Sequence, residues 1–219
     1  MSIASKIAEL RAVLPSSVEL IAVSKTYPPS AVMEAYEAGQ RVFGENRPQE
    51  LVEKYRQLPG DIRWHLIGGL QTNKVKYVAP FVTMIHSGES ARLLEVIHKE
   101  ALKNDRVIDV LLEVHIAREA SKHGWQEDEL LAYLATGAYR ELTGVRFRGV
   151  MGVATFTDDM ECVRAEFTRL NALFARLRSE FFDDRFDTLS MGMTADYPVA
   201  VECGSTMVRI GSYIFGARG

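Results

Sequence analysis

The sequence predicts a single (β/α)8 barrel of the TIM type. Short runs rich in Val, Ile and Leu recur along its 219 residues, and several are almost wholly apolar. Parallel strands that are covered on both faces have this composition. Stretches of roughly ten to twenty residues with helical periodicity separate the runs, as crossover connections do. About eight such strand–helix units fit into the chain, which is the number that closes a barrel.

The expected strands are short and spread evenly along the chain. They cover residues 20–24, 41–43, 64–68, 84–86, 107–115, 145–153, 188–191 and 207–211. The runner-up architecture is an open doubly wound sheet, but no G-x-G-x-x-G turn follows the first strand.

The clearest helix is expected over residues 158–182, where apolar side chains repeat every three or four positions. Asp158 and Glu161 form a plausible capping pair at its start. A second helix is expected to begin after Ser90 as its N-cap and to continue through residue 101.

Residues 1–14 place Lys6, Glu9 and Arg11 at helical spacing among apolar positions, which predicts an extra N-terminal amphipathic helix rather than a signal peptide. Only residues 212–219 follow the last strand, so an eighth crossover helix is expected to be missing. The N-terminal helix could cover the last strand instead. With no linker or low-complexity tract in the sequence, residues 1–219 are expected to form one domain.

The composition excludes several classes of function. The net charge is −3, which leaves no electrostatic footprint for nucleic acid or for an anionic membrane. Cys162 and Cys203 form no C-x-x-C pair and are typical of reduced thiols in a cytoplasmic protein. No segment has the length of a transmembrane span, and no His, Cys, Asp or Glu spacing predicts a metal site.

Lys25 is the most informative residue, because it directly follows the apolar strand at residues 20–24. Burial disfavours an ammonium group and lowers its pKa, and a partly neutral lysine is a nucleophile toward aldehydes. The structural alternative is a lysine that extends its charged end into solvent from a strand terminus.

Further glycine, serine and arginine residues stand at the ends of other strands. In a barrel of this kind, the functional face is built from the carboxyl ends of the strands, with a phosphate site after strands seven and eight. Ser190 to Met193 and Arg209 to Ser212 occupy those two places. A lysine on strand one that faces a phosphate cradle describes a pocket for pyridoxal 5′-phosphate, an aldehyde that carries a phosphate.

Several motifs, taken together, resemble the pyridoxal phosphate homeostasis protein family. These are Val23-Ser24-Lys25-Thr26, Phe43-Gly44-Glu45-Asn46, Trp64-His65-Leu66-Ile67-Gly68, Leu189-Ser190-Met191-Gly192-Met193 and Gly204-Ser205-Thr206-Met207-Val208-Arg209-Ile210-Gly211. They appear in order over nearly the whole chain. Arg47-Pro48, Gly69 and Thr194 depart from the family pattern, but none of them alters Lys25 or Arg209.

The resemblance implies the barrel of the alanine racemase N-terminal domain, with pyridoxal 5′-phosphate bound to Lys25 as an aldimine. It implies that Arg209 faces the pyridine nitrogen and that Asn46 lies near the cofactor. It also implies that the phosphate is held by Ser190, Met191, Gly211 and Ser212.

An arginine at the pyridine nitrogen has a chemical consequence. Its guanidinium offers only donors, so the ring nitrogen accepts a hydrogen bond and stays unprotonated. Such a ring is a poorer electron sink than one paired with an Asp, and it suits racemase-like chemistry in which well-placed bases manage proton transfer. The chain stops at Gly219, which is expected to leave no room for the second domain that supplies the opposing base in alanine racemases. The family resemblance likewise implies storage, delivery or buffering of the cofactor, with effects on amino-acid and keto-acid balance.

Two enzymatic alternatives stay open at this point. One is a racemase for a small amino acid, with Lys25 and either His65 or Tyr197 as bases; His65 and His86 are otherwise structural histidines. The other is an aldolase that uses Lys25 without a cofactor. For the leading hypothesis, the expected partners are pyridoxal 5′-phosphate and the apo-enzymes that depend on it. Without a partner domain, a monomer is expected.

Overall fold

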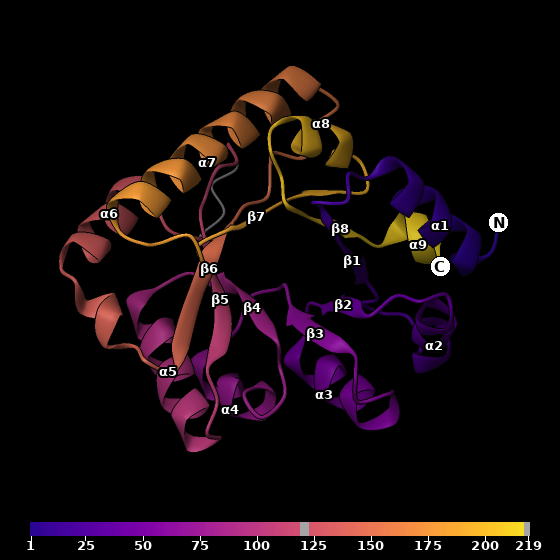
Figure 1. Cartoon of the computed structure of the whole chain (residues 1–219), viewed down its shortest axis with the longest axis horizontal. Helices are drawn as coiled ribbons and strands as arrows, with labels where there is room; N and C mark the ends of the chain where they lie inside the picture. Colours follow the sequence, from indigo (N-terminus) through magenta and orange to yellow (C-terminus); the bar gives the residue numbers. More distant parts are fainter. Residues whose placement is uncertain (119–122, 217–219) are drawn as a thin grey trace.

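The fold is a closed barrel of eight parallel strands, ordered β1 to β8 around the ring (Figure 1). The computed structural model describes residues 1–118 and 123–216. The strands are β1 (Glu19–Val23), β2 (Val42–Glu45), β3 (Arg63–Leu66), β4 (Met84–Gly88), β5 (Ile108–Glu113), β6 (Val145–Met151), β7 (Thr188–Met193) and β8 (Met207–Ile210). Each expected strand is confirmed, with every end within two residues of its expected position.

Helices lie outside the barrel and fill the connections between strands (Figure 1). They are α1 (Ile3–Val13), α2 (Pro29–Glu37), α3 (Pro48–Gln57), α4 (Val75–Val78), α5 (Ala91–Lys103), α6 (Glu127–Ala135), α7 (Met160–Glu180), α8 (Tyr197–Glu202) and α9 (Ser212–Phe215), with short 3-10 turns at Thr72–Lys74 and Ala138–Glu141. The side chain of Ser90 caps α5 as expected. The expected capping residue of α7 was wrong by one position: Asp159, not Asp158, accepts from the N–H groups of Glu161 and Cys162.

The barrel closes where the first and last strands pair. Ile21 lies beside Arg209, and Ala22 lies beside Ile210. On the outside of this seam, α1 lies next to α9, where Lys6 Nζ donates to the carbonyl of Ile214 (3.4 Å). After β8, the described part of the tail forms the single helical turn α9, which the sequence analysis did not predict. Residues 217–219 of the expected tail lie outside the described residues.

Two apolar layers stabilise the barrel. A small inner cluster joins side chains from six strands, which are Ile21, Val23, Val42, Met84, Leu111, Met151 and Met207. A much larger outer cluster lies between the strands and the helices and includes Phe43, Trp64 and Phe167. Because side chains alternate along a strand, the neighbours of each inner residue face the helices. This alternation assigns every strand residue to the interior or to the wall.

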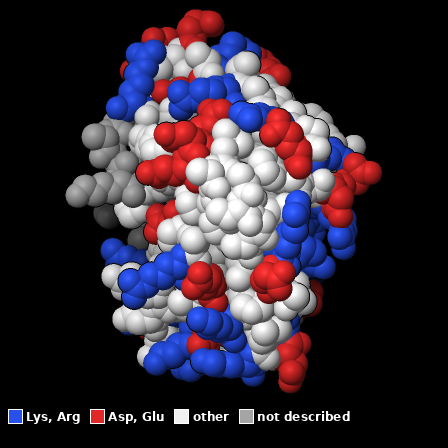
Figure 2. All heavy atoms as spheres, turned by 90° about the vertical axis from the view of Figure 1, so that its left-hand side faces the viewer, with Lys and Arg blue, Asp and Glu red and all other residues white. Residues whose placement is uncertain are grey.

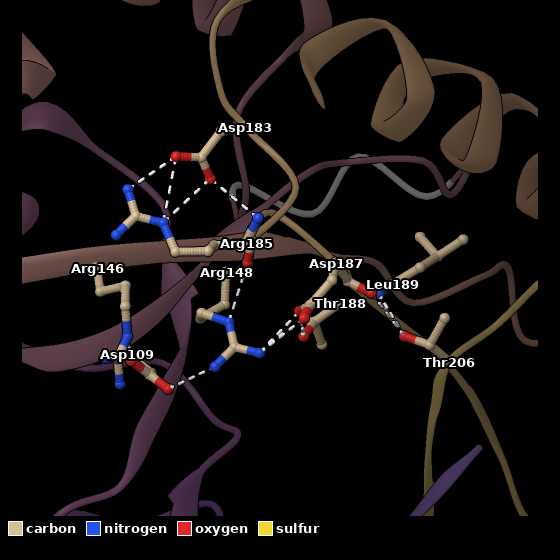
Figure 3. Close-up of polar contacts among 9 residues, drawn as sticks. All are labelled: Asp109, Arg146, Arg148, Asp183, Arg185, Asp187, Thr188, Leu189 and Thr206. Atoms are coloured by element: carbon tan, nitrogen blue, oxygen red, sulfur yellow. Dashed lines mark hydrogen bonds and ion pairs between the residues drawn. The ribbon is translucent and has the colours of Figure 1, made fainter. Parts of the chain in front are cut away.

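The amino ends of β5, β6 and β7 are joined by ion pairs (Figure 3). The carboxylate of Asp109 accepts from Arg146 (2.5 Å) and from Arg148 (3.2 Å). Arg148 also pairs with Asp187 (2.8 Å), just before β7. Ion pairs that hold the strands in register at this end of the barrel contribute to stability and not to the site, since the functional face lies at the opposite end.

Gly149 makes a close contact between β6 and β7. The register of β5 and β6 shifts at this point, from Val110 beside Phe147 to Leu111 beside Gly149. Gly149 has a φ of 156°, and a Cβ atom there would lie 1.7 Å from the carbonyl oxygen of Thr188. A side chain cannot be placed at this position without separating the two strands.

We therefore expect Gly149→Ala to lower the free energy of unfolding by about 3 kcal/mol or more, because the strand pairing must open to admit the methyl group. Urea denaturation at neutral pH measures this. Gly60→Ala is the matched control, since a Cβ there meets nothing within 4 Å, and its effect is expected to stay within about 0.5 kcal/mol. Equal stability of the two variants would contradict the assigned contact.

Within the described ranges, no helix is long and apolar enough to cross a membrane. On the face of the molecule where α5, α6 and α7 lie, basic and acidic groups are interspersed around an uncharged area (Figure 2). The charge distribution on this face is mixed rather than predominantly basic.

Candidate functional site at the barrel mouth

The carboxyl ends of the strands form one end of the barrel, called the barrel mouth here. Ile21 and Val23 point into the barrel, and Lys25 is the next residue in this inward series. Lys25 is half-buried and lies in the turn that follows β1. The structure therefore places the lysine singled out in the sequence at the mouth of the barrel.

Arg209 reaches the interior from β8 and is 4% exposed. Its Nη1 donates to the hydroxyl of Ser190 (2.7 Å), and its Nη2 donates to the carbonyl of Gly152 (3.0 Å). Burial lowers the pKa of Arg209 to about 10, although Asp196 and Glu113 act in the opposite direction. The guanidinium therefore stays charged at neutral pH and keeps further N–H donors.

Two histidines extend the contacts of Arg209 into the barrel. Ser190 Oγ lies 3.2 Å from Nδ1 of His86, and Nε2 of His86 lies 3.1 Å from Nδ1 of His65. Burial lowers the pKa of His65 to about 3 and that of His86 well below its usual value, so both rings are neutral. With Arg209 as donor to Ser190, one consistent assignment has Ser190 donating to His86 and His86 donating to His65. This chain fixes the position of the arginine.

Asn46 follows β2 and is half-buried at the mouth. The N–H of Ile67 donates to the carbonyl of Glu45 (2.9 Å), so the backbone pairing of β2 and β3 continues up to this point. Asn46 and Gly68 are the next residues on the two strands. The amide side chain of Asn46 thus starts from the same end of the barrel as Lys25.

The loops after β7 and β8 form the other side of the mouth. Gly211 lies against β1, where a Cβ atom would be 2.9 Å from the carbonyl oxygen of Val23, and Ser212 begins α9. The N–H of Met193 donates to Asp196 (2.6 Å). Ser190 lies deeper, with its hydroxyl against Arg209, and the side chain of Met191 packs in the outer cluster.

Glu113 is a mouth residue that the sequence analysis did not identify. It continues the inward series of Leu111 on β5, the strand opposite β1 in the ring. It lines a hollow of about 260 Å³ together with His115, His123, Val153 and Phe156. Burial, followed by repulsion from Glu89, raises the pKa of Glu113 to about 7. Inward alternation on β5 was the sequence signal that could have identified it.

A second carboxyl group missed by the sequence analysis is Glu45, which lies behind the wall of the barrel. Its Oε1 accepts from Ser24 Oγ (2.6 Å) and from Lys54 Nζ (2.7 Å), while its buried Oε2 has no hydrogen-bond partner among the described atoms. Burial raises the pKa of Glu45 to about 7 and outweighs the opposing effect of Lys54. Glu45 therefore titrates near neutral pH.

The fold and the site define a class of protein: an alanine racemase-type barrel with a lysine at the end of its first strand and a buried arginine in its last. The sequence profile of the family described as "Alanine racemase, N-terminal domain" matches residues 1–219. The chain is 42% identical over 204 residues to the "Pyridoxal phosphate homeostasis protein" of Aquifex aeolicus, covering 91% of this chain and 87% of that one. It is 40% identical over 210 residues to the protein of that name from Escherichia coli K12, covering 93% and 87%. The chain belongs to this family.

Solved structures agree with this assignment. PipY of Synechococcus elongatus, solved with pyridoxal phosphate bound, is 38% identical and has a TM-score of 0.90, covering 98% of this chain and 100% of that one. Alanine racemase from Bartonella henselae is 16% identical with a TM-score of 0.73, covering 98% of this chain and 58% of that one. The latter similarity shows the fold alone.

The position of His65 does not favour the racemase alternative. Its ring is 2% exposed and contacts His86 inside the barrel, where burial keeps it neutral. A structural role for both histidines, in which they support Ser190 and Arg209, explains these contacts.

We expect Glu45→Gln to make the slope of the free energy of unfolding against pH more positive than in the wild type between about 4.5 and 7. A carboxyl group whose pKa rises on folding stabilises the protein below its unfolded pKa, and this contribution is lost as the pH rises through the folded pKa. The slope removed by the substitution is at most about 1.4 kcal/mol per pH unit. His65 and His86, whose pKa values are lowered by burial, make the free energy of unfolding rise with pH. The quantity compared is therefore the difference in slope between the variant and the wild type.

Urea denaturation across this pH range measures the difference. Glu53→Gln is the control, because Glu53 is exposed on α3, the helix that carries Lys54. If Glu45→Gln and the wild type kept the same slope, the raised pKa would be wrong.

Proposed function

We propose that this protein binds pyridoxal 5′-phosphate covalently through Lys25 and acts in the homeostasis of that cofactor. The observation that carries the proposal is the pairing of β1 with β8, which brings the lysine-bearing strand beside the strand of Arg209. The relatives named pyridoxal phosphate homeostasis protein, and PipY with the cofactor bound, support it.

The residues at the mouth fit this ligand. Lys25 supplies the amine that condenses with the aldehyde, and the cofactor, when bound, supplies an electrophilic ring and a phosphate. Arg209 is charged, fixed in place and able to donate to an unprotonated ring nitrogen. Asn46 stands on the neighbouring strand end and is assigned to the region beside the ring.

The phosphate is assigned to the loops after β7 and β8. Gly211 and Ser212 offer backbone N–H groups and a hydroxyl on one side. Ser190 and Met191 lead into the other loop, and the hydroxyl of Ser190 also holds Arg209.

Binding without turnover is the activity that these groups support best. An arginine donor keeps the pyridine nitrogen unprotonated and limits the electron-withdrawing power of the ring, so turnover would need well-placed bases. His65, one candidate base, is buried against His86 inside the barrel. We therefore assign a carrier role, in which a single cytoplasmic domain, residues 1–219, acting as a monomer, buffers the cofactor and delivers it to dependent apo-enzymes. No contact specific for the aldolase or racemase alternative supports a second function.

We expect the purified protein, once supplied with pyridoxal 5′-phosphate, to show a yellow absorbance band that borohydride abolishes. Lys25→Ala is expected to lack the band, because no other residue at the site is assigned as the amine. Lys99→Ala is the matched control, since Lys99 is exposed on α5, and it is expected to retain the wild-type spectrum. A wild-type protein that takes up no cofactor, or a Lys25→Ala variant that keeps the reducible band, would contradict the proposal.

A further inference from the structure

Both sequence neighbours of Lys25 are held by charged side chains. Ser24 donates from its hydroxyl to Glu45 (2.6 Å), and its carbonyl accepts from Lys54 Nζ (2.7 Å). On the other side, the N–H of Thr26 donates to Glu50 Oε1 (2.6 Å). The backbone that carries Lys25 is therefore fixed immediately before and immediately after it.

Lys54 joins these contacts into one network. It lies on α3, is 3% exposed, and donates to the carbonyl of Ser24, to Glu45 and to Glu50, each at 2.7 Å. An ammonium group has three N–H donors, so these three acceptors use all of them. Lys54 is thus committed to structure, in contrast to a nucleophilic lysine.

The network lies outside the barrel. Gly44 continues the inward series of Val42, so the next residue, Glu45, faces α3. By the same alternation, the side chain of Ser24 points outward from the barrel, because Val23 before it and Lys25 after it point inward. The charged residues of the network can therefore influence the mouth through the backbone of the turn that carries Lys25, without touching a ligand there.

The turn needs such support because Thr26 has a φ of 71°. This left-handed conformation is unfavourable for a residue with a branched Cβ and persists only where surrounding contacts impose it. The hydrogen bond from Thr26 to Glu50 is such a contact.

We propose that Glu45, Glu50 and Lys54 form a clamp that positions the turn carrying the reactive lysine. The inference rests on the function proposed above. These three are positioning residues, because they act on Lys25 through Ser24 and Thr26. Loss of the clamp lets the turn relax and misplaces the amine, while the arginine and phosphate sides of the mouth stay intact.

The test compares Glu50→Ala with Glu50→Gln and with the control Glu53→Ala, which removes an exposed carboxylate from the same helix. Three quantities are measured: amide hydrogen exchange at Thr26 without ligand, the rate at which pyridoxal 5′-phosphate becomes borohydride-trappable on Lys25, and the affinity for pyridoxine 5′-phosphate. The last compound keeps the ring and phosphate but lacks the aldehyde, so it reports the non-covalent site alone.

Glu50→Ala is expected to speed exchange at Thr26 by about tenfold, because the N–H of Thr26 loses its acceptor. It is expected to slow covalent capture by about tenfold as well, because orientation of the amine controls its reaction. Its affinity for pyridoxine 5′-phosphate is expected to stay within about twofold of wild type. Glu50→Gln keeps an acceptor oxygen and is expected to restore part of both losses. Glu53→Ala is expected to match the wild type.

Wild-type exchange or wild-type capture in Glu50→Ala would overturn the clamp. So would an equal loss of pyridoxine 5′-phosphate affinity, which indicates general damage to the site. Failure of the proposed function is distinguishable, because the wild type itself would then capture no pyridoxal 5′-phosphate. The exchange measurement needs no ligand and would still decide whether Glu50 holds the turn.

Discussion

The pairing of β1 with β8 is the constraint on which the rest of the structure depends. It joins residues about 190 positions apart, with Ile21 beside Arg209 and Ala22 beside Ile210. Once the ring is closed, alternation along each strand decides which side chains reach the interior. The same register that places Arg209 inside the barrel places Gly211 against Val23, next to the turn that carries Lys25. Barrel closure and assembly of the site are therefore one event.

The interior of the barrel holds Arg209 in place, and the outer side of the wall holds the turn that carries Lys25. Inside the barrel, a chain of neutral histidines and Ser190 fixes a charged arginine without adding a second charge. Behind the wall, Lys54, Glu45 and Glu50 hold the residues on either side of Lys25. Burying an ion pair is costly and is a weak source of net stability, but its fixed geometry can specify one conformation. Here that conformation is a strained turn at Thr26.

The sequence allowed most of the fold to be predicted, because apolar runs and helical periodicity are local signals. Every strand was located, and the errors lay at ends and caps, such as the N-cap at Asp159 and the single turn of α9. The position of Lys25 at a strand end was also visible locally. The partners of Lys54 were not, since Ser24, Glu45 and Glu50 meet only after α3 packs on the barrel. The raised pKa of Glu113 likewise depends on burial at the mouth, which no local pattern encodes.

The most direct test of the central claim is a crystal structure of the protein grown with pyridoxal 5′-phosphate. The account predicts electron density continuous from Nζ of Lys25 to the ligand, with the ring nitrogen within hydrogen-bond distance of Arg209 and the phosphate between the loops after β7 and β8. Density for the ligand at another lysine, or with the phosphate rather than the ring facing Arg209, would contradict it.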